Sequence, residues 1–170
     1  YAPTWTLDAS PPSAIGSLRA GTWLILRDHT ESAVADALAR ELGARGTEAM
    51  VHDWSPPLPS GALEALSRQR KAGIAGAIVF LANKPPDAAE ALLEDLTRLC
   101  ETLERDRGKE PIRVIITTSG AASVFGEAVA DHRAALALGG VLVLPTEFPE
   151  LGMRQVDIDR SGSSDLSQIA

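Results

Sequence analysis

The sequence predicts a doubly wound α/β fold, in which a mostly parallel sheet of about five strands carries helices on both faces. Two observations lead to this prediction. Apolar runs of strand length alternate along the chain with segments whose apolar residues recur every three or four positions, as they do on a helix. The strand-like runs are almost continuously apolar, which is typical of parallel strands that are buried on both faces.

Residues 1–21 precede this alternation and are expected to hold an N-terminal strand and a linker. A short extended patch at 4–7 is followed by a stretch rich in Pro, Ser and Gly. We expect residues 1–7 to pair with a segment that is distant in the sequence.

The first strand and the first helix follow within 22–46. "TWLILRD" is an apolar run of the buried kind, and "TESAVADALARELGARG" has one apolar stripe, formed by Val34, Leu38 and Leu42. Two glycines at the end of the second segment supply the helix stop.

The middle of the chain adds two strands with a helix between them. "EAMVHDW", at 48–54, predicts a weaker strand, and "AGAIVFLAN", at 75–83, predicts the central strand. Between them "SPPLPS" predicts a loop, after which Ser60 is placed to cap a helix that carries Leu63 and Leu66.

A third helix is predicted to begin at Asp87, because Glu90 three residues later makes a weaker relative of the capping box. Gly108 ends this helix, and "PIRVIITT", at 111–118, predicts another buried strand. The apolar stripe of the helix consists of Leu92, Leu96, Leu99 and Leu103.

The last helix is predicted from Asp131 through Leu138, and "RQVDID", at 154–159, is predicted as the last strand. We expect residues 22–160 to form a single domain and 161–170 to be a polar tail that leads to the next domain.

The stretch "GGVLVLPTEFPELG" joins this helix to this strand. We expect Gly139 and Gly140 to let it pack closely on a neighbour. Pro145 and Pro149 fix φ and predict a rigid turn, in which Glu147 is a capping or bridging carboxylate.

The composition limits the partners. The chain has 170 residues, 45% of them hydrophobic, and a net charge of −7 with no basic stripe. Nucleic acids and anionic membrane surfaces are therefore poor partners. No apolar run is long enough to span a bilayer and no leader is visible, so we expect a cytoplasmic protein. The single cysteine, Cys100, excludes an internal disulfide and a cysteine-based metal cluster.

The turn after the first strand argues against a dinucleotide site. Such a site needs glycines there, so that backbone N–H groups can approach a diphosphate at a helix N-terminus. This turn, 27–32, reads "RDHTES": it has no glycine and places the carboxylates of Asp28 and Glu31 where a diphosphate would lie. The Ser119-Gly120 turn could offer N–H groups to an anion, but a tight strand-to-helix turn explains it better.

Other catalytic patterns are missing. The sequence has no G-x-x-x-x-G-K-[ST] loop and no G-x-S-x-G motif. His29, His52 and His132 form no cluster at metal-binding spacing. His52 and Asp53 are the best titratable pair, and a solvated strand end explains them equally well.

The remaining reactive side chains fit structural roles. Glu90 with Glu94, and Glu101 with Glu104, are expected on the exposed faces of helices. We expect Cys100 to be a buried or boundary thiol. The tryptophans divide into Trp23, expected in the core, and Trp5 and Trp54, which could lie in the core or at an interface.

A phosphorelay receiver domain shares the alternating order but needs other residues. It requires an Asp at the end of the third strand and a Lys at the end of the fifth. The third strand here ends Leu81-Ala82-Asn83, and the fifth ends with Asp157 and Asp159. We therefore reject that hypothesis.

The chain as a whole resembles the structural, N-terminal subdomain of modular polyketide synthase ketoreductases. "YAPTWTL" is similar to the first strand of that subdomain, with its Tyr-x-x-x-Trp, and "AGAIVFLA" and "IRVIITTSGAASV" resemble its inner strands. Where family members often have a glycine, this chain has Thr30 or Glu31. The most specific resemblance is "GGVLVLPTEFPELGMRQVDID". Its matched positions are Gly139, Pro145, Glu147, Phe148, Pro149 and Asp157.

This resemblance implies a truncated Rossmann-like unit that has lost cofactor binding and supports a separate catalytic half. That half carries the NADPH loop and the catalytic tyrosine, and it reduces a β-ketoacyl group on an acyl carrier protein. The only tyrosine here is Tyr1, within the N-terminal strand. We therefore expect no catalytic, cofactor-binding or metal-binding residue in this chain, and we expect NADPH only in the missing half.

Two other functions stay open at this point. The chain could be the remnant of an inactive ketoreductase that acts as a scaffold beside methyltransferase or dehydratase domains. It could also be a free-standing α/β oxidoreductase. A G-x-G-x-x-G loop after residue 170 would favour the supporting subdomain, and NADPH binding by this chain alone would favour the oxidoreductase.

Overall fold

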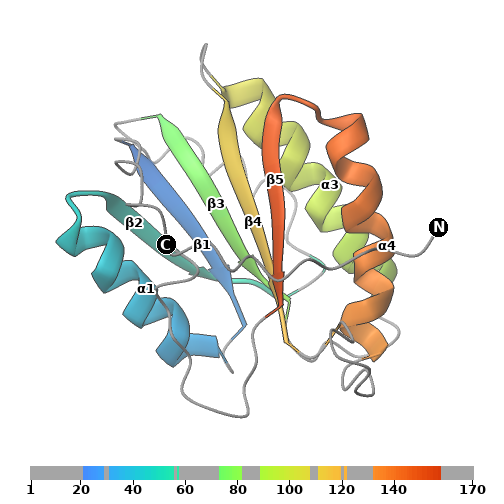
Figure 1. Ribbon diagram of the computed structural model, residues 1–170, viewed down its shortest axis with the longest axis horizontal. Coiled ribbons are helices and arrows are strands. Elements are labelled where there is room, and N and C mark those ends of the chain that lie inside the picture. Colours follow the sequence, from blue (N-terminus) through green and yellow to red (C-terminus); the bar gives the residue numbers. More distant parts are fainter. Residues whose placement is uncertain are drawn as a thin grey trace, which may run out of the picture.

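A computed structural model confirms the α/β fold, with five parallel strands and helices on both faces of the sheet (Figure 1). The structure describes residues 21–28, 31–55, 57, 73–81, 89–107, 111–119, 121 and 132–157. In chain order its elements are β1 (Thr22–Arg27), α1 (Ser32–Ala44), β2 (Glu48–Asp53), β3 (Ile74–Phe80), α3 (Ala89–Asp106), β4 (Ile112–Thr118), α4 (His132–Glu147) and β5 (Leu151–Asp157).

The strands lie in the order β2-β1-β3-β4-β5. β1 pairs with β2 on one side and with β3 on the other, so the strand order reverses between β1 and β3. In this class of fold, ligands bind beside such a point, outside the carboxyl ends of the strands. These ends meet at the lower edge of the sheet in Figure 1, which we call the carboxyl edge.

Each face of the sheet has its own hydrophobic cluster. On one face, alternate side chains of β1, β3, β4 and β5 pack against the predicted leucine stripe of α3 and against α4. On the other face, β1 and β3 pack against α1 through Ala35, Leu38 and Leu42. The predicted stripes are thus confirmed, except that Ala35 replaces Val34, which is only partly buried.

Gly76 of β3 makes room for the indole of Trp23 on the adjacent strand. The two residues are paired in the register of β1 and β3, and a Cβ atom at position 76 would lie 2.7 Å from the Trp23 ring. Trp23 itself is 3% exposed, as expected for a core residue. The glycine is therefore required by a close approach of a large side chain.

The segment from Gly139 to Glu147 is helical, which corrects the predicted end of the last helix at Leu138. α4 continues to Glu147 and includes Pro145 within its last turn. Apolar packing explains the difference, because Val141, Leu144 and Phe148 follow a helical spacing and are all buried against the sheet. This tertiary packing outweighs the low helix propensity of two glycines and a proline.

Of the predicted turn around Glu147, only the part at Pro149 is found. Pro145 belongs to the helix and not to a turn, and the turn that follows is closed by hydrogen bonds from Phe148 N–H to Leu144 and from Leu151 N–H to Phe148. Glu147 is exposed, and no hydrogen bond or ion pair joins it to another described residue. The last strand also begins earlier than predicted, at Leu151.

Some predictions fall outside the described residues. They concern the N-terminal strand at 1–7, the helix capped by Ser60, the caps at Asp87 and Gly108, and the tail at 161–170. These stay predictions.

Candidate functional site

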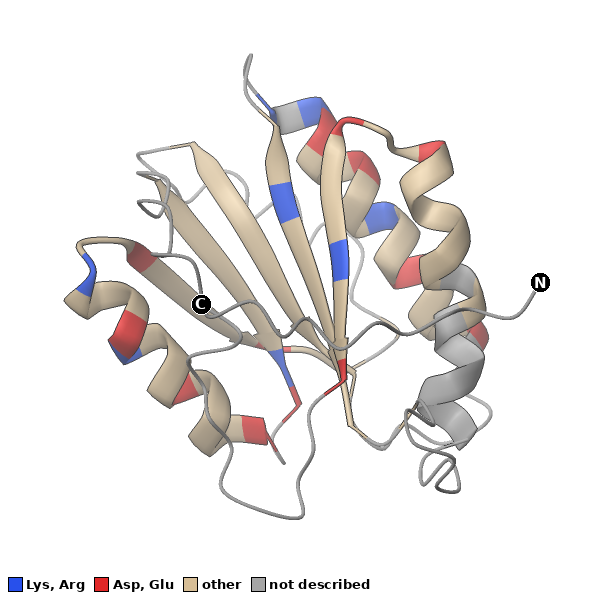
Figure 2. Cartoon of the chain, in the orientation of Figure 1, with Lys and Arg blue, Asp and Glu red and all other residues tan. Residues whose placement is uncertain are grey.

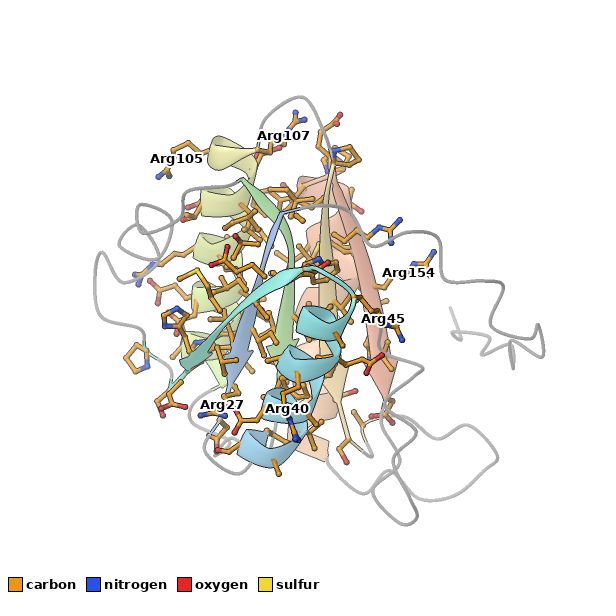
Figure 3. All side chains as sticks on the ribbon, turned by 90° about the vertical axis from the view of Figure 1, so that its left-hand side faces the viewer. Arg27, Arg40, Arg45, Arg105, Arg107 and Arg154 are labelled. Carbon is orange, nitrogen blue, oxygen red and sulfur yellow. The ribbon has the colours of Figure 1, made fainter. Side chains whose placement is uncertain are left out.

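The side chain of Arg27, the last residue of β1, lies at the carboxyl edge and is bonded to β2 and α1 (Figure 3). Its Nη1 donates a hydrogen bond to the Ser32 carbonyl at 3.2 Å and another to Asp36 at 2.6 Å. Its Nε donates to Asp53, the last residue of β2, at 3.1 Å. The hydrogen bond to Asp53, together with the charges of Asp36 and Asp53, raises the pKa of Arg27. We call Arg27, Asp36 and Asp53 the Arg27 cluster.

The Arg27 cluster and its surroundings disfavour a diphosphate at the start of α1. Arg27 is already balanced by two carboxylates, and Glu31, at the N-cap, is a third acid that is 6% exposed and makes no capping hydrogen bond with its side chain. A phosphate there would approach three carboxylates, whose like charge repels it. His29 and Thr30 of this turn lie outside the described residues.

The turn after β4, which the sequence favoured as a structural turn over an anion site, is bonded to Asp157. Asp157 Oδ1 accepts a hydrogen bond from the Thr118 hydroxyl at 2.8 Å and from the backbone N–H of Ala121 at 3.2 Å. Gln155 donates to the same hydroxyl at 3.3 Å. A backbone N–H that could hold an anion is therefore used by a carboxylate of the chain itself. Ser119 is partly buried at this turn.

Sequence reasoning matched Asp157 to a family motif but did not predict this contact. The available signal was the register of two adjacent parallel strands. Thr118 closes β4 and Asp157 closes β5, and the two are paired. A hydroxyl and a carboxylate at paired strand ends are within hydrogen-bonding reach.

Trp54, for which two locations were left open, lies in the core. It follows β2 and is 1% exposed, and its backbone N–H donates to the Arg27 carbonyl at 2.6 Å. Its indole Nε1 donates to Asp95 of α3 at 3.3 Å, and Asp95 is also 1% exposed. This contact between β2 and α3 was missed, because Asp95 follows the exposed Glu94 and looks like one more solvated acid of the helix.

His52 and Asp53 do not form a catalytic pair. Consecutive residues of a strand point to opposite faces, and Asp53 belongs to the Arg27 cluster. His52 is partly buried, and its Nε2 has no hydrogen-bond partner among the described residues. Burial lowers the pKa of His52 below its usual 6.5, while the negative charge of Asp53 acts in the opposite direction.

We expect the imidazole of His52 to titrate below 6.5 in the folded protein. Unfolded His52 then binds its proton first, so the free energy of unfolding falls as the pH drops from 6.5 toward the pKa of the folded state. An NMR titration measures this pKa, and His52→Gln assigns the signal. Asp53→Asn should lower the pKa further. A pKa at or above 6.5 would contradict the burial of this side chain.

Cys100 is a buried thiol of α3, as expected. Burial raises its pKa to about 12, and the charges of Glu104 and Glu101 add to the effect. Because only the thiolate is a good nucleophile, we expect Cys100 to be inert toward Ellman's reagent at neutral pH until the chain is unfolded. The same reaction in denaturant is the control, and full reaction of the native protein would show that α3 opens.

Three of the four other candidate acids lie on exposed helix faces, as the sequence predicted, and Glu104 does not. Glu90, Glu94 and Glu101 are exposed, and Glu104 is partly buried. Among the described residues, no group of three or more His, Cys, Asp or Glu side chains could hold a metal ion. The helices of the same part of the chain are too short or too polar to cross a membrane.

No protein-family model matches the chain, and no curated protein is found to match it.

Proposed function

We propose that this chain is a non-catalytic structural subdomain of a polyketide synthase ketoreductase. In this role it supports the NADPH-dependent half that reduces a carrier-bound β-ketoacyl group in the cytoplasm. The chain contributes packing and position, and the missing half contributes the chemistry.

The observation that carries the proposal is the apolar outer surface of α4. Leu142 is 68% exposed and Val143 is 55% exposed, although neighbouring residues of the same helix are buried against the sheet. Glu147 is the only acid or base from Gly139 to Glu147, and Figure 2 shows this part of α4 almost without charged positions. A helix that is apolar on both sides is typically buried on both sides. A partner that covers α4 would remove these side chains from water.

The carboxyl edge supports the non-catalytic part of the proposal. In a cofactor-binding half, N–H groups and cations at this edge are left for the ligand. Here Arg27 is paired with Asp36 and Asp53, and the N–H of Ala121 is bonded to Asp157.

The strand order is compatible with a truncated Rossmann unit, and it is also the flavodoxin-like order of doubly wound folds. The dinucleotide-binding order 3-2-1-4-5-6, without its third strand, becomes the order found here. Among the matched motif positions, Phe148 is buried with α4 and the sheet, and Asp157 closes β5. These positions therefore have structural contacts that a supporting subdomain would keep.

Co-expression with a catalytic half tests the proposal. That half is taken from the same gene, and its solubility and melting temperature are measured with and without this chain. We expect both to rise, because the apolar surface of α4 is buried in the complex. The double variant Leu142→Glu with Val143→Lys keeps the net charge and should abolish the increase.

A matched control lies on the opposite side of the sheet. Ala33 is exposed on α1, so Ala33→Glu should leave the increase unchanged. If neither property of the catalytic half changes, the supporting role is wrong. Saturable binding of NADPH to this chain alone, followed by cofactor fluorescence, would favour the free-standing oxidoreductase instead.

A further inference from the structure

β2 lies at one edge of the sheet, and among the described residues it pairs with β1 alone (Figure 1). Edge strands of natural proteins usually carry a lysine, a proline or a bulge that prevents pairing with another chain. β2 reads "EAMVHD": it has no Lys or Pro, and its register with β1 is continuous. The opposite edge strand, β5, contains Gly152 and the exposed Arg154, which disfavour such pairing. β2 is therefore the less protected edge of the sheet.

The two acids of β2 do not protect its edge, because both are bonded to β1. Glu48 accepts a hydrogen bond from the Thr22 hydroxyl at 3.0 Å, and Asp53 accepts one from Arg27 at 3.1 Å. Between these acids, residues 49–51 are uncharged and only partly buried. The centre of the strand thus presents an uncharged backbone to a partner.

The bonds to β1 show which backbone groups of β2 face outward. The N–H of Trp54, just after β2, donates to the Arg27 carbonyl at 2.6 Å, so this residue faces β1. The N–H and C=O of one residue point to the same side of a strand, and successive residues alternate. Every second residue before Trp54 therefore also faces β1, and the others face away from it. The backbone groups that face away, which we call the outer edge of β2, belong to Ala49, Val51 and Asp53.

An identical strand fits the outer edge of β2 in an antiparallel arrangement. A two-fold axis at Met50 pairs Ala49 with Val51 of the second copy, and both residues have outward groups that exchange N–H···O bonds. The same register sets Glu48 opposite His52 of the second copy. Cβ atoms of directly opposite residues are about 4.5–5.5 Å apart, so the Glu48 carboxylate can accept a hydrogen bond from that imidazole. A two-fold axis at Val51 would instead set His52 opposite Met50, which offers no such bond.

We propose that two copies of this chain pair through the outer edge of β2, antiparallel, with the two-fold axis at Met50 and with Glu48 opposite His52 of the second copy. The sheet then continues from one copy into the other. This proposal does not depend on the proposed function, because α4 packs beside β5 at the opposite edge of the sheet.

Sedimentation equilibrium of the full chain tests the pairing. We expect a monomer–dimer equilibrium at concentrations up to about 1 mM, the range for a small interface. Val51→Pro removes an N–H of the outer edge and no bond to β1, and proline is tolerated at such a position of an edge strand. This variant should be a folded monomer by circular dichroism and sedimentation. A wild-type chain that stays monomeric, or a dimer that Val51→Pro does not weaken, would overturn the proposal.

The double variant Leu142→Glu with Val143→Lys is the control, because it changes the exposed surface of α4 and leaves β2 intact. It should form the dimer as the original chain does. If it dissociates the dimer, the two copies meet through α4 and the proposal is wrong.

A charge exchange tests the register. His52→Glu should raise the dissociation constant of the dimer about tenfold, because the two-fold axis sets like charges opposite each other at two places. Adding Glu48→Lys should restore the affinity, since each position then faces an opposite charge. If the second substitution does not restore it, the proposed register is wrong. This experiment decides alone if Val51→Pro does not fold.

Discussion

Replacing Trp54 with alanine is expected to lower the free energy of unfolding by about 3–5 kcal/mol, the usual range for removing a buried aromatic side chain. Trp54 is among the largest fully buried side chains, and its indole joins the end of β2 to α3 through Asp95. The variant creates a cavity and also takes a hydrogen bond from a carboxylate that is 1% exposed. Chemical denaturation followed by circular dichroism measures the change.

Phenylalanine separates the two contributions. Trp54→Phe keeps most of the volume but removes the donor to Asp95, and we expect a loss of about 1.5–3 kcal/mol for a hydrogen bond to a charged group. Trp23→Phe is the matched control, because the Nε1 of Trp23 is buried without a hydrogen-bond partner among the described residues. If Trp54→Phe and Trp23→Phe lower the free energy of unfolding by the same amount, the hydrogen bond from Trp54 to Asp95 contributes nothing to stability.

The second large effect is expected at Gly76. A methyl group there would lie 2.7 Å from the ring of Trp23, which is itself 3% exposed. Gly76→Ala should therefore destabilise the fold by about 1–3 kcal/mol, the range for overpacking, despite the better strand propensity of alanine. Urea unfolding of the original chain and of the Gly76→Ala variant measures this loss of stability.

Two controls identify the clash as the cause. At Gly152 of β5, an added Cβ would meet the Ile112 carbonyl oxygen at an ordinary 3.8 Å, so Gly152→Ala should be neutral or slightly stabilising. Trp23→Leu lowers stability by itself, but in that background Gly76→Ala should have little further effect. If Gly76→Ala still lowers the free energy of unfolding in the Trp23→Leu background, the clash with the indole is not the cause.

The fold class and most strands were predictable because hydrophobic burial leaves a periodic pattern in the sequence. The continuous apolar run of β1 and the leucines of α3 are local signals that tertiary contacts reinforce. The end of α4 was not predictable in the same way. Gly139, Gly140 and Pro145 are local signals against a helix, and only the packing of α4 on the sheet overrides them.

The contacts at the carboxyl edge were the hardest to predict. That the turn after β1 has no glycine could be seen in the sequence, but the bond from Arg27 to Asp53 depends on the pairing of β1 with β2. The bond from Arg27 to Asp36 depends on how α1 packs beside β1. The contact of Asp157 likewise depends on the register of β4 and β5. Such pairings join residues far apart in the sequence, and periodicity alone does not reveal them.

The bond between Asp157 and the turn after β4 has a thermodynamic consequence. A protein whose anion position is completed by a free ligand gains stability as the ligand concentration rises, by mass action. Here the carboxylate is part of the same chain, so its local concentration is fixed by the fold and dilution cannot remove it. The contribution of this bond to the stability of the fold is therefore intramolecular and requires no free anion.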